Sequence, residues 1–315
     1  MAESLPIELV TYIFQMAAYL FRSTNRGAVV TLALTSSFVY NTVAPILYER
    51  IVFGSGRTTA FEAFLKNESV AAKVLKHTRF LCAGSPYFQP HSSGVALLVN
   101  LDTVHCTIGL WSHIAFLQAR DGRAIPGNVR VIWPSLPLDL AVGDHTRNLR
   151  SITRYHGFMP CNYFDSEFPQ LEQDVEHWTR RMLDLMPRLT HLGFSQIDAA
   201  NVENNYTDKQ LEAFELMLRT VSTCQMPCVQ VAALRLTGRT VTRLTAYVRI
   251  ARSVDENWAM GRLRIWADKR VLETRWVEPD LIVDDARTER SIWTEPEPLS
   301  YHLAQKSENS VAVSG

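Results

Sequence analysis

The 315-residue sequence has no excess of charge, no long apolar run and no basic leader. Its 32 Lys and Arg residues balance its 32 Asp and Glu residues, so the formal net charge is zero. Proteins that bind a phosphate backbone normally carry a basic surplus, so nucleic acid is not an expected partner. No apolar run approaches the roughly 18 residues that cross a bilayer, and Glu3 and Glu8 interrupt the N-terminal stretch. We therefore expect neither a membrane partner nor a secretory signal.

Cysteine is scarce and its spacing matches no known framework. The five cysteines, at positions 82, 106, 161, 224 and 228, are odd in number and widely scattered. This usage predicts reduced thiols in a cytoplasmic or nuclear protein. Cys224 and Cys228 have a spacing that invites a metal, but no second Cys or His pair stands at a matching distance, so both are expected to be buried thiols. We predict no metal and no cofactor.

The motifs of common catalytic sites are also missing. The sequence contains no Gly-x-Ser-x-Gly elbow, no His-Glu-x-x-His helix and no phosphate-binding loop. His145, His156 and His191 are expected on the surface or in loops, and the pair Asp284-Asp285 lies in a charged terminal region. The prediction is therefore a protein that is not an enzyme and has no catalytic residue. The alternative of an α/β enzyme with an irregular active site stays open.

The first fifty residues predict a small helical bundle. Residues 6–20 form an expected helix, because Leu9 and Ile13 belong to one apolar stripe and Phe14 to an adjacent one. A second helix is expected over residues 28–38, after which Pro45 interrupts the pattern before a last short turn. One helix cannot bury two stripes alone, and a 45-residue bundle is small for independent stability. Its apolar surface should therefore pack on the next domain, on a partner, or on both.

Three blocks in this bundle match a known family in order and in spacing. They are Leu5-Pro6-x-Glu8-Leu9-x-x-x-Ile13-Phe14, then Leu32-Ala-Leu-Thr-Ser-Ser-Phe38, then Ala44-Pro45-Ile-Leu47-Tyr48. Together they resemble an F-box, particularly the form abundant in mushroom-forming fungi. In that family the helices bind the Skp-type adaptor of a cullin-RING ubiquitin ligase, and the rest of the chain selects the substrate protein.

The resemblance implies roles for individual residues. It places Leu5, Pro6, Leu9, Ile13 and Phe14 in or beside the adaptor contact. It also assigns support of the bundle to Leu32, Leu34, Phe38 and Leu47. The family usually has a Cys-Arg pair and a Trp in the middle block, where this chain has Thr, Ser and Phe. The alternative is a helical cap on the following domain in a protein that never joins a ligase.

After Tyr48 the sequence changes to short β-like runs separated by helical or loop segments. The candidate strands are residues 78–82, 103–106, 129–133, 149–153, 189–194, 232–236 and 262–266, with a terminal strand at 281–283. The pattern Leu189-x-x-Leu192-x-Phe194 fits the strand of a leucine-rich repeat. Its competitor is a doubly wound α/β domain, but no Gly-rich phosphate loop follows any candidate strand.

These observations predict an α/β protein in which a three-helix F-box precedes an irregular, leucine-rich-repeat-like open solenoid. The expected domains are residues 1–50, residues 51–295, and a linker and tail over 296–315. Arg130, Arg154, Arg235 and Arg264 fall at alternate or end positions of candidate strands, where an arginine and aromatic face would suit protein recognition. The expected function is that of a ligase subunit that binds the adaptor through its helices and an unidentified substrate protein through the repeats.

Overall fold

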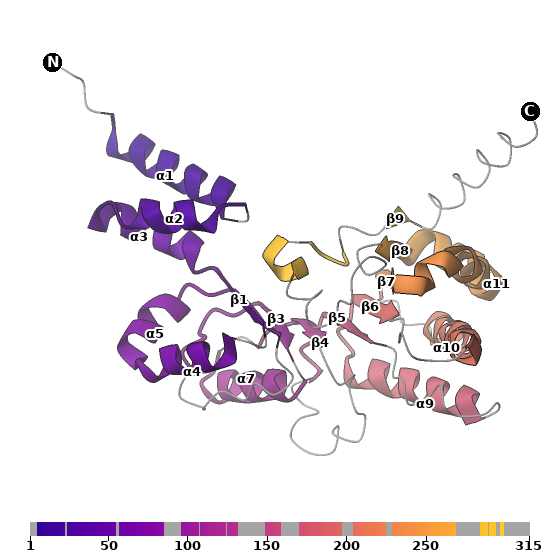
Figure 1. Ribbon diagram of the computed structural model, residues 1–315. Helices are drawn as coiled ribbons and strands as arrows, with labels where there is room; N and C mark the ends of the chain where they lie inside the picture. The colour runs from indigo at the N-terminus through magenta and orange to yellow at the C-terminus, as the bar shows by residue number, and fades with distance from the viewer. Residues whose placement is uncertain are drawn as a thin grey trace, which may run out of the picture. The chain divides into compact units, whose positions relative to one another are not determined.

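The structure is a computed structural model, and Figure 1 shows its helices and strands. It describes residues 5–22, 24–54, 57–84, 96–106, 108–123, 125–131, 149–158, 170–196, 204–224, 229–268, 284–288, 290–293 and 297–298. The chain divides into two compact units. Unit 1 comprises Met1–Pro126 with Pro279–Arg290, and unit 2 comprises Gly127–Glu278 with Ser291–Gly315. The predicted terminal strand at 281–283 lies outside the described residues, and so does most of the predicted tail.

Unit 1 begins with three helices and continues with parallel strands. Its elements are α1 (Ile7–Phe21), α2 (Arg26–Ala33), α3 (Ser37–Leu47), β1 (Arg50–Gly54), α4 (Thr58–Lys66), α5 (Glu68–Leu75), β2 (Phe80–Gly84), β3 (Thr103–Cys106) and α7 (Ile108–Arg120). Strands β1, β2 and β3 pair side by side in chain order, with Arg50 opposite Phe80 and Phe80 opposite Thr103. Strand β1 was not predicted from the sequence.

The break between α2 and α3 differs from the predicted single helix over residues 28–38. The Ser36 hydroxyl accepts a hydrogen bond from the backbone N–H of Val39 at 3.2 Å, so Ser36 caps the start of a new helix. Helix α3 then runs through Pro45, so the predicted interruption at this proline is wrong. Pro45 is exposed near the end of α3, so water can reach the carbonyl that loses its helical partner.

Unit 2 repeats a strand followed by a helix. Its elements are β4 (Asn128–Val131), β5 (Arg154–Phe158), α9 (Gln170–Leu185), β6 (His191–Gln196), α10 (Asn204–Thr223), β7 (Val231–Thr237), the 3-10 helix η4 (Gly238–Arg243), α11 (Leu244–Arg262), β8 (Leu263–Asp268) and β9 (Glu297–Pro298). Strands β4 to β8 are parallel neighbours in chain order, and β9 pairs antiparallel with β8. The predicted α/β class is therefore confirmed.

The three long helices of unit 2 pack on one face of its strands. Trp178 of α9 lies against Phe194 of β6, with 5.9 Å between ring centroids. Residues of α10 and α11, including Phe214 and Trp258, surround a small apolar void with Leu192 and Leu234. Because these strand residues alternate with polar ones, the opposite face of the strands is free of these helices (Figure 1).

One backbone arrangement recurs at the starts of the strands. The carbonyl just before a strand accepts hydrogen bonds from two consecutive N–H groups that open the next strand. The five acceptors are Glu49 and Arg79 in unit 1 and Gly127, Thr153 and Thr190 in unit 2, at N to O distances of 2.8–3.2 Å. Chain segments far apart in sequence thus share one local geometry, as expected when similar structural units stack in order.

One predicted strand is shifted along the chain. Residues 149–153 were expected to form it, but they form a turn in which the N–H of Ile152 bonds the carbonyl of Leu149. Strand β5 follows at Arg154–Phe158. Leu149 and Ile152 are both buried, so their hydrophobicity reflects burial beneath the strand start and not pairing in the sheet.

Candidate interaction surfaces

The three N-terminal helices share a small apolar core. Its buried residues are Ala18, Val29, Ala33, Val39, Val43, Ile46 and Leu47. Phe14, Leu32 and Tyr48 pack against this cluster and are themselves half-buried. From α1 the buried set contains Ala18 alone, with Phe14 packed beside it, so one side of α1 faces the cluster. Leu32 and Leu47 thus support the bundle, as expected.

Four of the five predicted adaptor-binding residues are exposed on or beside α1. Leu5 and Pro6 precede the helix, and Leu9 and Ile13 follow at four-residue steps with 44% and 48% of their surfaces exposed. The side chains of Leu9 and Ile13 therefore share one face of α1. The fifth residue, Phe14, points into the bundle and packs against its core.

Exposed apolar side chains are concentrated on these helices. Among the described residues, thirteen of the fifteen large apolar side chains with broad exposure lie between Leu5 and Tyr40. The sequence analysis gave roles to few of them, and Ile7, Tyr12 and Phe21 were missed. The signal that could have found them is the width of the apolar face of α1, because a small bundle cannot bury apolar residues on every side of a short helix. Exposed apolar side chains gathered in this way are typical of an interaction site.

Two residues expected to support the bundle do not do so. Leu34 is 78% exposed and Phe38 is 39% exposed, although both were predicted to be internal. Leu34 is the residue that ends α2, and Phe38 lies in the first turn of α3. Because the chain turns between them, neither continues the buried face of α2. Both side chains instead extend the apolar surface of the helices.

Two arginines connect the helices to the first strand of unit 1. Arg22, just after α1, forms an ion pair with Glu49 at 2.6 Å. Arg26, the first residue of α2, donates to the carbonyl of Leu47 in α3 at 3.0 Å and to the carbonyl of Arg50 in β1 at 3.4 Å. The Thr78 hydroxyl also donates to the carbonyl of Tyr48 at 3.0 Å, which joins the end of the helical segment to the approach of β2. These contacts attach the helices to the strand region where α1 ends and β1 begins, which is called the base of the helices below. Helix α1 extends away from this base.

A hollow of about 510 Å³ lies beside this base. Tyr19 and Pro45 line it from the helices, and Lys76, His77 and Arg79 line it from the segment before β2. Burial, and then the charge of Lys76, lower the pKa of His77. Arg79 is paired with Asp102 at 2.7 Å on an exposed surface. The walls carry both charge signs, so the hollow shows no preference for one class of ligand.

The side of the unit 2 strands that faces away from the helices carries polar and aromatic residues in rows. One row runs across Asn128, Arg154, His191 and Val231 on β4 to β7. The next runs across Arg130, His156, Gly193, Ala233 and Arg264, and a third across Ser195, Arg235 and Trp266. All four arginines that were predicted on this face do share it.

Two of those arginines are not available to a partner. Arg235 is 1% exposed and forms a buried ion pair with Asp268 of β8, with Nη2 at 2.7 Å and Nε at 3.1 Å from the same carboxylate oxygen. Its guanidinium also stacks 4.6 Å from the ring centroid of Trp266. Arg130 is buried as well. The predicted recognition role of Arg130 and Arg235 is therefore wrong, because neither guanidinium faces solvent.

A serine and a histidine also meet on this face. The Ser195 hydroxyl lies 2.9 Å from Nε2 of His156. Both residues are buried, and His156 packs edge-on against Trp293 with 6.4 Å between ring centroids. The expected surface or loop position of His156 is therefore wrong, since it lies within β5. The pair joins two strands, and its burial keeps substrates away from the hydroxyl.

Near the strand starts, the same face remains accessible. Arg154 is exposed, and His191, Arg264 and Trp293 are half-buried. His191 begins β6, within the predicted strand over residues 189–194, and its half-buried place on this accessible face agrees with the expected surface position. Burial lowers the pKa of His191, and the neighbouring charges of Arg154 and Arg264 lower it further. These three side chains therefore form a positively charged area beside a tryptophan ring.

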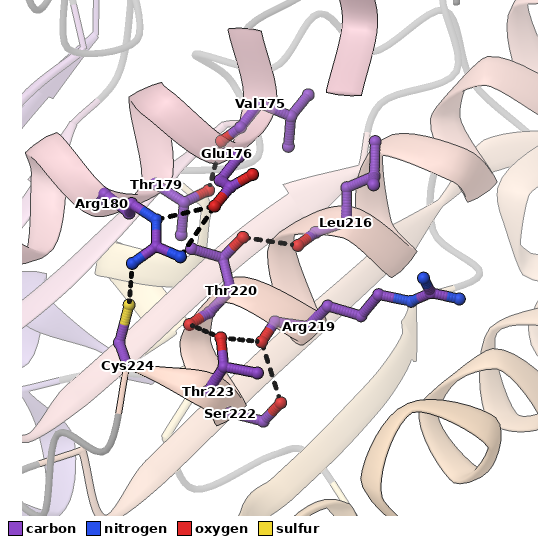
Figure 2. A network of polar contacts seen from close by, with 10 residues as sticks. All are labelled: Val175, Glu176, Thr179, Arg180, Leu216, Arg219, Thr220, Ser222, Thr223 and Cys224. Carbon is purple, nitrogen blue, oxygen red and sulfur yellow. Dashed lines mark hydrogen bonds and ion pairs between the residues drawn. The ribbon is translucent and has the colours of Figure 1, made fainter. Parts of the chain in front are cut away.

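The cysteine pair at 224 and 228 can be judged at one position. Figure 2 shows Arg180 of α9 between Glu176 and Cys224, which follows the end of α10. Its guanidinium donates to Glu176 at 2.8 Å and lies 3.7 Å from the Cys224 sulfur. Cys224 is half-buried, so its predicted full burial is wrong, and Cys228 lies outside the described residues. Within the described ranges no three His, Cys, Asp or Glu residues are grouped to hold a metal.

The described part of unit 1 contains the other two cysteines with known positions. Cys82 on β2 and Cys106 on β3 are buried thiols. Burial, with the neighbouring Cys82, raises the pKa of Cys106 well above its ordinary range. Cys106 therefore stays protonated at neutral pH and is a poor nucleophile and metal ligand.

The fold and these surfaces define an α/β protein with parallel strands and an apolar helical segment at its N-terminal end. No protein-family model matches the chain, and neither a curated protein nor a solved structure matches it. Among the helices that the structure describes, none is long and apolar enough to span a bilayer.

Proposed function

We propose that this protein is the substrate-recognition subunit of a Skp-cullin-F-box type ubiquitin ligase. The observation that carries the proposal is the exposed apolar surface of α1 to α3, which includes Leu5, Leu9 and Ile13 at the positions where the F-box resemblance puts the adaptor contact. In this role the protein supplies binding and no chemistry. It works in the cytoplasm or nucleus, where its partners are the Skp-type adaptor and a substrate protein.

Energetics support an adaptor on this surface. Burying a large apolar side chain contributes about 1.5–3 kcal/mol before the costs of association. Leu9 and Ile13 are neighbours on one helix face and about half exposed, so a partner would gain from covering both at once. Phe14 contributes differently, because it packs on the bundle core and positions α1. The contact residues are therefore Leu5, Pro6, Leu9 and Ile13, with Phe14 in a supporting role.

The strand region is proposed to be an irregular leucine-rich-repeat-like solenoid that holds the substrate protein. Strands that pair in chain order and helices on one face of unit 2 both support a repeat over a doubly wound domain, in which helices cover both faces. The recurrent backbone hydrogen bonds at the strand starts support it too. We place the F-box at residues 1–50, the repeats at 51–295 and a linker and tail at 296–315.

The adaptor contact is tested by capture of a purified Skp-type adaptor from a mushroom-forming fungus. Wild-type protein is expected to retain the adaptor on a column, and the double variant Leu9→Asp/Ile13→Asp is expected to lose it. Each carboxylate would have to be desolvated against an apolar partner, so capture should fall at least about tenfold. Quantitative pull-down or calorimetry measures the change.

The matched control is Val70→Asp/Phe116→Asp. These residues are 44% and 51% exposed on α5 and α7 of unit 1, so the same charges are added at similar exposure away from α1. The control should capture the adaptor as wild type does, and both variants should keep the wild-type melting temperature. If wild type fails to bind, or if both double variants bind equally, the ligase proposal is wrong and the helices are a domain cap.

A further inference from the structure

Unit 2 brings positive charge together at the open part of its strand face. Arg154 and His191 begin β5 and β6 and stand directly opposite each other in the register. Arg264 is the second residue of β8 and lies one row further along, level with Gly193. All three side chains leave the same face of the strands, because their positions fall in the alternate set that the helices do not cover.

No acidic side chain among the described residues pairs with the two guanidinium groups of this cluster. Elsewhere in unit 2, Arg180 and Arg252 each pair with a glutamate one helical turn away, at 2.7 Å. The side chains of Arg154 and Arg264 form no ion pair or hydrogen bond with any described residue. The positive charges of Arg154 and Arg264 instead act on His191 and, after burial, lower its pKa further. Repulsion of this kind is relieved when an anion binds.

Trp293 forms an aromatic wall beside the cluster. Its ring meets His191 edge-on at 5.3 Å between centroids. The ring can lie this close to the sheet because residue 193 is glycine: a Cβ there would stand 3.0 Å from Cη2 of Trp293. The structure therefore seats a tryptophan next to three cationic or protonatable side chains. Tryptophan and arginine are the residues most enriched among interface hot spots.

The side chain of Thr190 contacts the imidazole of His191 and orients it. The Thr190 hydroxyl lies 2.9 Å from the carbonyl oxygen of Thr153 and 2.9 Å from Nδ1 of His191. This contact holds Nδ1 toward Thr190 and leaves Nε2 as the ring nitrogen that can face a ligand. A bound anion would favour the charged ring and accept a hydrogen bond from its Nε2.

We propose that Arg154, His191 and Arg264 form a binding site for the carboxylate or phosphate groups of an acidic segment of the substrate protein, with Trp293 packing against that segment. The inference rests on the proposed receptor function, because it assigns a chemical class to the substrate. It follows from charge complementarity: the cluster is cationic, partly exposed and not neutralised by the described part of the chain.

The test measures binding of short fluorescent peptides by anisotropy with the full-length protein at low salt. One probe carries four glutamates, a second carries four glutamines in their place, and a third carries two phosphoserines among serines. Wild type should bind the glutamate or the phosphoserine probe and should bind the glutamine probe at least about tenfold more weakly. Comparing the first and third probes identifies the anion, and inorganic phosphate as competitor shows whether a free ion suffices.

The decisive variant is Arg154→Gln/Arg264→Gln, and its matched control is Arg181→Gln/Arg249→Gln. The control removes two exposed arginines from α9 and α11, the helices on the opposite face, and so changes the net charge equally. The site variant should lose about tenfold or more in affinity for the anionic probe, and the control should lose less than about threefold. Equal losses would mean unspecific attraction, and no loss in the site variant would mean that the anion binds elsewhere. Either result, or equal binding of all probes, overturns the proposal.

The same proteins separate this inference from the proposed function. The Arg154→Gln/Arg264→Gln variant should still capture the adaptor, because its changes lie in unit 2 and the apolar helices lie in unit 1. The Leu9→Asp/Ile13→Asp variant should still bind the anionic probe. Adaptor binding without peptide binding would overturn only the substrate site. Peptide binding without adaptor binding would overturn the ligase role and leave an anion-binding protein.

Discussion

The protonation of His191 makes the charge of the strand face of unit 2, and the stability of the folded state, depend on pH. Burial first, and then the charges of Arg154 and Arg264, lower its pKa below the ordinary value of 6.5. At neutral pH the ring is therefore uncharged. As pH falls below 6.5 the unfolded chain takes up this proton before the folded one, so the folded state loses stability until the pH has passed below the folded pKa.

We expect Arg154→Gln to raise the pKa of His191 without restoring the ordinary value, because burial of the ring remains. An NMR titration of the imidazole carbon-bound protons measures the shift. Arg181→Gln on α9 is the control and should leave the titration unchanged, since that side chain lies on a helix that packs on the opposite face. An unchanged His191 titration in Arg154→Gln would contradict the assigned cause.

At the scale of elements, one ion pair joins the last two parallel strands. Arg235 of β7 and Asp268 of β8 are both at most 3% exposed and are 2.7 Å apart. Removing one partner of such a pair leaves the other charge buried, which costs more than the pair itself contributes. The attachment of β8 to β7 therefore depends on keeping both charges or neither.

Arg235→Met should lower the free energy of unfolding by about 3–5 kcal/mol, as measured by urea denaturation. The double variant Arg235→Met/Asp268→Leu should recover most of that loss, because it removes both charges and keeps apolar volume. The control is Arg252→Met, which breaks an exposed pair with Glu256 and should cost about 0.5 kcal/mol or less. A double variant no more stable than Arg235→Met would show that the residues act independently.

The elements that sequence reasoning found are those whose pattern reflects their own burial. Strand β3 at Thr103–Cys106 matches the predicted run, and the ends of β6 to β8 match within two residues, because their apolar side chains face the helices. The predicted strand over residues 149–153 is wrong because Leu149 and Ile152 are buried in a turn. The break at Ser36 was missed because a local capping hydrogen bond outweighed the apolar periodicity across it.

The two candidate surfaces differed in how far the sequence indicated them. The exposed face of α1 follows from its two apolar stripes, because a short helix in a small bundle packs the stripe of Phe14 on the core and leaves the stripe of Leu9 and Ile13 uncovered. The arginine face was foreseen as a set, but only Arg154 and Arg264 are accessible. No local sequence pattern indicates that Arg235 forms an ion pair with Asp268, or that Trp293 contacts His191, which is 102 positions away in the sequence. Both contacts arise from tertiary packing.

On the scale of the whole molecule, polar and apolar surfaces are unevenly distributed. The described residues of unit 1 carry all fifteen of the large, broadly exposed apolar side chains, and thirteen belong to the first forty residues. The net charge is zero, so no overall repulsion keeps copies of the chain apart. A protein built in this way should stay dispersed only when a partner covers the helices.

We therefore expect the isolated protein to associate reversibly as its concentration rises. Sedimentation velocity should show a weight-average mass that grows with concentration for wild type and for Val70→Asp/Phe116→Asp. Leu9→Asp/Ile13→Asp should remain monomeric over the same range, because the charges would be desolvated in any self-contact through α1. Adding the adaptor to wild type should replace the larger species by a one-to-one complex, since both contacts use the same face. A wild-type protein that stays monomeric at every concentration would contradict this prediction. It would show that the exposed apolar side chains of the helices do not drive association, and this would remove the physical support for an adaptor contact there.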